Sequence, residues 1–92
     1  MTSKLILVID DEESIQKVVK LSLKLEANWE SICASSGQEG FSQAKTQQPD
    51  AILLDVMMPE IDGIKTFEML NNNLQKQAIP VIMLPAKTGT AE

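Results

Sequence analysis

Three short aliphatic runs constrain the fold of this chain more than any other feature. They are residues Leu5–Ile9, 51–54 and 81–84, and each is bounded by polar residues or by proline. Continuous apolar runs of this length are typical of strands that are covered on both faces in a parallel sheet. Residues 29–34 form a weaker candidate strand, which we expect nearer an edge of the same sheet.

Amphipathic segments lie between these runs, as the crossovers between parallel strands require. Residues 14–25 predict a first helix with an apolar face and an opposite, solvated face of lysines. The apolar face comprises Ile15, Val18, Val19 and Leu25, and the lysines are Lys17, Lys20 and Lys24. Strands that alternate with helices predict an α/β fold with a doubly wound parallel sheet, in which ligands bind at the carboxyl ends of the strands.

Two further helices are expected later in the chain. Ser36 and Glu39 have the spacing of a capping box, which predicts the start of a second helix that Gly40 weakens. A third helix is expected beyond Gly63, where the chain leaves a turn. Its predicted inner face comprises Ile64, Phe67, Leu70 and Leu74.

The composition excludes several classes of function. The chain has no histidine and a formal net charge of -5, and all of its basic residues are lysines. Histidine-based catalysis and histidine metal sites are therefore excluded, and direct binding to nucleic acid is not expected. The single Cys33 cannot form an internal disulfide, and no apolar run approaches the length of a membrane span. We expect a cytoplasmic protein that does not enter the membrane.

Carboxylates follow two of the predicted strands. Asp10 and Asp11 come directly after the first run, and Asp55 comes directly after the run at 51–54. Because parallel strands end at the same edge of a sheet, these carboxylates are expected to converge and to repel one another, which either a raised pKa or a bound cation would relieve. Oxygen ligands of this kind suit Mg²⁺. Acidic residues at this point of the chain can also stabilise the start of the first helix without binding a metal. We adopt this interpretation for Glu13.

Four segments of the chain carry a family resemblance. They read LVIDDE at residues 7–12, LDVMMP at 54–59, EIDG at 60–63 and IPVIML at 79–84. In this order and approximate spacing they resemble the receiver domain of bacterial two-component response regulators, of the chemotaxis-regulator type. The resemblance implies a flavodoxin-like sheet over residues 1–92, and a signalling module in place of an enzyme.

The resemblance also assigns roles to residues. Asp55 would accept a phosphoryl group from a sensor histidine kinase or a phosphotransfer protein. Mg²⁺ would be held by Asp11, Asp55 and the backbone carbonyl of Met57, with Asp10 acting through a bound water or through its charge.

The chain departs from the family pattern near its C-terminal end. Pro85 stands where receivers have a small hydroxyl residue, and Thr88 is displaced from that position by three residues. The sequence stops before the family's fifth strand, its last helix and its lysine, so we expect a truncated receiver. Lys87 is expected to be an ordinary solvated lysine. The strand at 81–84 would have no fifth strand beside it. We expect its unpaired edge to pair with another copy of the chain and so to form a homo-oligomer.

Two alternatives to a phospho-acceptor remain at this point. The first is a degenerate receiver that acts as a protein–protein interaction module without switching. The second is a magnesium-dependent phosphohydrolase that resembles the haloacid dehalogenase family. That family requires an aspartate two residues after its nucleophile, where this chain has Met57. Hydrolysis of an external substrate is therefore not expected.

Overall fold

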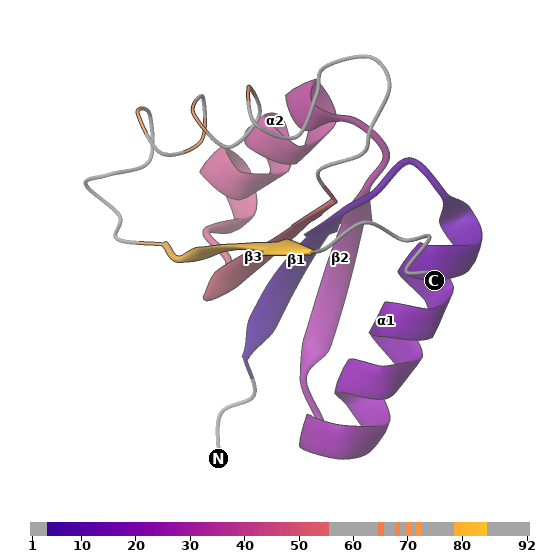
Figure 1. Cartoon of the computed structure of the whole chain (residues 1–92). Coiled ribbons are helices and arrows are strands. Elements are labelled where there is room, and N and C mark those ends of the chain that lie inside the picture. The colour runs from indigo at the N-terminus through magenta and orange to yellow at the C-terminus, as the bar shows by residue number, and fades with distance from the viewer. Residues whose placement is uncertain are drawn as a thin grey trace.

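The computed structural model describes residues 4–55, Lys65, Glu68, Leu70, Asn72 and 79–84. Within these residues, strands and helices alternate along the chain (Figure 1). The elements are β1 (Leu5–Ile9), α1 (Glu13–Ala27), β2 (Glu30–Ala34), α2 (Gly37–Gln47), β3 (Ala51–Asp55) and β4 (Val81–Leu84). Between β3 and β4, Lys65, Glu68, Leu70 and Asn72 have helical backbone. All four predicted strands are thus confirmed, as are the first two predicted helices.

The strands form one parallel sheet in the order β2-β1-β3-β4. This order confirms the flavodoxin-like, doubly wound α/β prediction, and β2 lies at an edge as expected. The register aligns the strand ends, because Ile9 pairs with both Ala34 and Leu54. Residues that follow β1 and β3 therefore emerge at the same edge of the sheet.

The two described helices lie on opposite faces of the sheet (Figure 1). The core lies between the sheet and α2, and comprises Leu7, Ile9, Ala34, Ala44, Ile52, Leu54 and Leu70. Burial of a leucine or isoleucine side chain contributes about 1.5–3 kcal/mol relative to exposure, so these contacts dominate the stability of this layer. Of the predicted inner face of the third helix, Leu70 is buried. Ile64, Phe67 and Leu74 lie outside the described residues.

The prediction for the inner face of α1 was partly wrong. Val18 and Leu25 are 61% and 73% exposed, although they were assigned to that face. The half-buried side chains are Ile15, Gln16, Val19 and Leu23. Three of these follow the i, i+4 spacing of one helical row, and this row faces the sheet. The apolar residues Val18 and Leu25 therefore lie on the solvent side of the helix.

The capping prediction for α2 is confirmed. Ser36 is the N-cap residue, and its side chain accepts a hydrogen bond of 3.1 Å from the backbone N–H of Glu39. The Glu39 carboxylate accepts in turn from the N–H of Ser35 at 2.9 Å, one residue earlier than in the usual reciprocal pattern. This exchange fixes the point at which the chain leaves β2.

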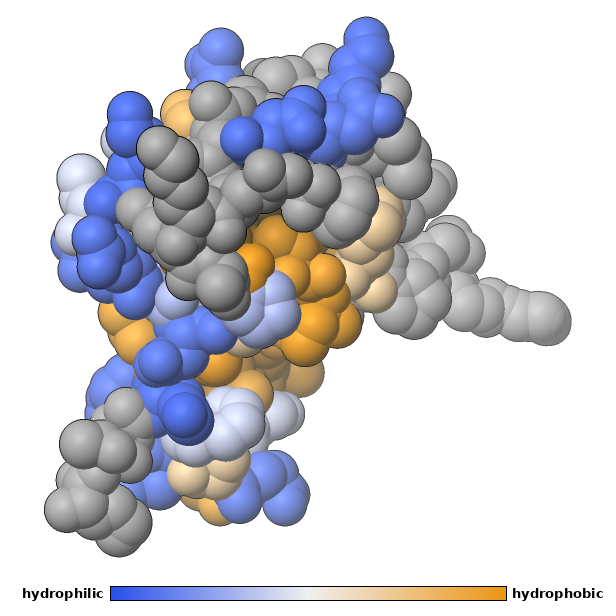
Figure 2. Space-filling view, turned by 90° about the vertical axis from the view of Figure 1, so that its left-hand side faces the viewer, coloured by the Kyte–Doolittle hydropathy of each residue, from blue (hydrophilic) through white to orange (hydrophobic). Residues whose placement is uncertain are grey.

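The opposite face of the sheet is less completely covered. Ile82 of β4 is 51% exposed. Figure 2 views the molecule from the left of Figure 1 and shows apolar surface gathered near the centre of that side. In the part of the chain that the structure describes, no helix is long and apolar enough to cross a membrane.

Candidate functional site

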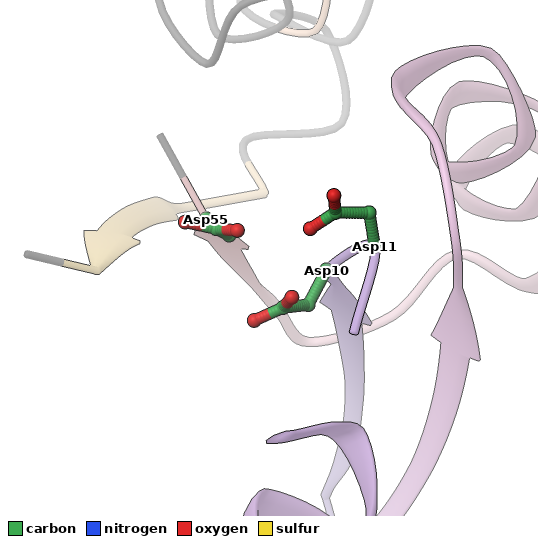
Figure 3. Close-up of side chains that lie close together, drawn as sticks. All are labelled: Asp10, Asp11 and Asp55. Carbon is green, nitrogen blue, oxygen red and sulfur yellow. The ribbon is translucent and has the colours of Figure 1, made fainter. Parts of the chain in front are cut away.

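Three aspartates meet at the carboxyl ends of β1 and β3. Asp10 and Asp11 directly follow β1, and Asp55 is the last residue of β3 (Figure 3). One carboxylate oxygen from each residue lies within 4.8 Å of the other two. The convergence predicted from the strand ends is therefore confirmed.

Two of the three carboxylates are buried. Asp10 and Asp55 are 0% exposed, whereas Asp11 is exposed. Charged carboxylates that are removed from water and placed beside one another are costly, and a bound cation offsets this cost. The donors are all oxygen atoms, which favours a hard cation such as Mg²⁺ over zinc or copper. The residues present thus fit a divalent metal.

The backbone around Asp10 is held by a set of hydrogen bonds. Its N–H donates to the carbonyl of Ala34 at 3.0 Å, and its carboxylate accepts from the N–H of Glu12 at 2.9 Å. The side chain of Gln16 donates to the carbonyl of Asp10 at 2.6 Å and to that of Ala34 at 3.3 Å. These contacts fix the direction in which the chain leaves β1, and hence the position of the Asp10 carboxylate.

Gln16 was not predicted from the sequence as a residue of the site. It is half-buried beside the row of Ile15, Val19 and Leu23, and its side chain joins the start of α1 to the ends of β1 and β2. Its place next to Ile15, on the side of α1 predicted to face the sheet, was the available signal. Glu13, by contrast, lies in the first turn of α1 and is exposed, as its interpretation as a helix-start residue requires.

Several predicted residues lie outside the part of the chain that the structure describes. They are Met57, Pro85, Lys87 and Thr88. The metal ligand assigned to Met57, and the consequences assigned to the other three, therefore stay predictions.

Comparison with known proteins decides the family. Residues 6–92 match the family model described as the response regulator receiver domain. This chain belongs to the response regulator receiver family. It is 44% identical over 85 residues to the alkaline phosphatase synthesis transcriptional regulatory protein PhoP of Bacillus subtilis, a match that covers 92% of this chain and 34% of that protein.

A second transcriptional regulatory protein also matches most of this chain but only part of its own length. The probable transcriptional regulatory protein TcrX of Mycobacterium tuberculosis is 33% identical over 87 residues, which cover 95% of this chain and 36% of that protein. The chain thus spans about a third of the length of these curated relatives.

Solved receiver structures have the same fold. The N-terminal domain of a response regulator receiver protein from Methanoculleus marisnigri superposes with a TM-score of 0.85 at 36% identity, covering 97% of this chain and 72% of that one. The chemotaxis response regulator CheY4 of Vibrio cholerae gives a TM-score of 0.82 at 30% identity, covering 96% and 72% respectively.

Membership of the receiver family indicates what kind of site the three aspartates form. A receiver is a signalling module, not a catalytic enzyme, and receivers are phosphorylated by histidine kinases. The triad of Asp10, Asp11 and Asp55 is typical of the Mg²⁺ site of receivers. The phosphohydrolase alternative is therefore set aside.

Proposed function

We propose that this protein is a phospho-acceptor of a two-component phosphorelay, and that Asp55 receives the phosphoryl group. The observation that carries the proposal is the convergence of Asp10, Asp11 and Asp55 at the ends of two adjacent parallel strands. A nucleophilic carboxylate and a metal site beside it are parts that phosphoryl transfer to an aspartate needs.

In the transfer step, a carboxylate oxygen of Asp55 attacks the phosphorus of a phosphohistidine on a histidine kinase or phosphotransfer protein. A bond forms between this oxygen and phosphorus, the bond from phosphorus to nitrogen breaks, and the partner's histidine is released. When bound, Mg²⁺ would supply positive charge that offsets the charge of the phosphoryl oxygens. Asp11, Asp55 and the backbone carbonyl of Met57 would hold the metal.

Asp10 has a different role in this proposal. It is buried and its position is fixed by Glu12, Gln16 and Ala34, so it adds a stationary negative charge beside the metal ligands. This charge favours binding of the cation without requiring Asp10 to contact it directly. We further propose that residues 1–92 act as one receiver domain, and that the exchange takes place in the cytoplasm.

Intact mass measurement tests the proposal. The protein is incubated with Mg²⁺ and acetyl phosphate, and a mass gain of one phosphoryl group is expected. The gain should disappear with a chelator and in the Asp55→Asn variant, whereas Glu26→Gln, an exposed substitution on α1, should leave it unchanged. Absence of any gain in the unmodified protein would favour the alternative of a degenerate receiver that acts by protein–protein interaction alone.

A further inference from the structure

A concave site that does not include the aspartates lies on the α1 face of the sheet. It is a pocket of about 390 Å³ between α1 and the first residues of β2. Glu30 and Ser31 of β2 line it, and they pair with Leu5 and Ile6 at the start of β1. Asp10 and Asp11 follow the other end of β1, so the pocket and the aspartates lie at opposite ends of the sheet. The volume is within the range of small-molecule sites.

Positive charge gathers at this pocket. Lys17, Lys20 and Lys24 all line it, because their i, i+3, i+7 spacing places them on one side of α1. Lys24 forms an ion pair with Glu30 at 2.6 Å. Lys17 and Lys20 have no ion pair with a described residue. The pocket therefore carries a net positive charge, in a chain whose formal net charge is -5.

The positive charge of Lys20 acts on two residues of β2, Cys33 and Glu30. Burial raises the pKa of the Cys33 thiol, and Lys20 acts in the opposite direction. Lys20 also contributes to the lowered pKa of Glu30, for which the hydrogen bond from Lys24 is the main cause. The ammonium group of Lys20 is thus close enough to β2 to act on an anion bound there.

Ser31 supplies a polar group within the pocket. It is 7% exposed, and its hydroxyl has no hydrogen-bond partner among the residues that the structure describes. Its neighbours Ile32 and Ala34 pack in the core on the α2 side, so alternation along β2 directs Ser31 toward α1. A buried hydroxyl without a partner is unfavourable, and a ligand oxygen would satisfy it.

The remaining walls are apolar. They are formed by Trp29 and Leu21, together with the aliphatic stems of the lysines. We propose that this pocket binds a small amphipathic anion, with an aliphatic or aromatic body and a carboxylate or phosphate head. The Ser31 hydroxyl donates to the head, Lys17 and Lys20 neutralise it, and the body contacts Trp29.

The fluorescence of Trp29 provides a direct measurement, because this is the only tryptophan in the chain. The full chain is titrated with octanoate, with octyl phosphate and with octanol, each below its aggregation limit. Saturable changes are expected with at least one of the two anions, and the comparison between them shows which head group is preferred. Octanol has the same apolar body without the charge, so it should bind at least about tenfold more weakly.

Substitutions then locate the site. Lys20→Gln should weaken anion binding about fivefold through the lost charge, and Ser31→Ala about tenfold through the lost hydrogen bond. Lys45→Gln, on α2 at the opposite face, is the matched control and should have no effect. The proposal is overturned if neither anion saturates, if octanol binds as well as the anions, or if Lys20→Gln behaves like the control.

Discussion

The side chain of Ile9 occupies the space in which a side chain at position 40 would lie. A Cβ atom placed on Gly40 falls 2.7 Å from Cγ1 of Ile9, well inside van der Waals contact. Both residues are buried, and Gly40 lies in the first half of α2. The glycine therefore permits a close approach between α2 and β1, the strand that leads into Asp10 and Asp11.

This contact predicts that Gly40→Ala destabilises the protein. Overpacking of a tight core costs about 1–3 kcal/mol, and we expect it to exceed the gain of up to ~1 kcal/mol from better helix propensity. Urea denaturation measures the difference, and Gln38→Ala, at an exposed position of the same helix, is the control. Combining Gly40→Ala with Ile9→Ala should cost less than the sum of the two single changes. A Gly40→Ala protein as stable as the control would contradict the account.

Removal of one buried carboxylate should stabilise the metal-free protein. Asp55→Asn eliminates a negative charge next to Asp10 and Asp11, and we expect its free energy of unfolding to rise by about 1–2 kcal/mol without Mg²⁺. Millimolar Mg²⁺ should raise the melting temperature of the unmodified protein, because a ligand of the native state stabilises it. The melting temperature of the Asp55→Asn variant should rise much less with Mg²⁺. Equal stabilisation of both proteins by Mg²⁺ would place the metal elsewhere.

Cys33 should react slowly with iodoacetamide at mildly alkaline pH. Burial raises the pKa of its thiol, so at a given pH less of the reactive thiolate is present than in the unfolded chain. Lys20 opposes this shift, so Lys20→Gln should move the pH–rate curve to still higher pH, whereas Lys45→Gln should not. Alkylation in urea gives the unfolded reference. A folded-state rate equal to that reference would show that burial does not protect the thiol.

The edge of β4 should mediate self-association. Among the described strands, β4 pairs only with β3, and its Ile82 is half exposed. An apolar strand edge is a template for pairing with a second copy. Sedimentation velocity should therefore detect a dimer or a larger species, and Ile82→Lys should shift the protein toward monomer. Thr46→Lys adds the same charge on α2 and should not. A stable monomer at high concentration in the unmodified protein would contradict this prediction.

The sequence predicted those features that depend on the order of residues along the chain. Continuous apolar runs identify strands such as Leu5–Ile9, and parallel strands end together, so the meeting of Asp10 and Asp55 followed directly. The sequence did not predict which side of α1 faces the sheet. Val18 and Val19 are equally apolar, and only the orientation of the helix over the sheet leaves Val18 exposed and Val19 half-buried. Gln16 and Gly40 could not be predicted either, because they act through contacts with Ala34 and Ile9, which are distant in the sequence.

Asp55 is the proposed acceptor of the phosphoryl group, and its modification can be located directly. After incubation with Mg²⁺ and acetyl phosphate, reduction with borohydride converts an aspartyl phosphate into homoserine, which peptide mass spectrometry can locate. We predict homoserine at position 55, dependent on both the metal and the phosphodonor, and none at Asp10, Asp11 or Asp50. Homoserine at another aspartate, or at none in a protein shown to be folded and to bind Mg²⁺, would contradict the assignment.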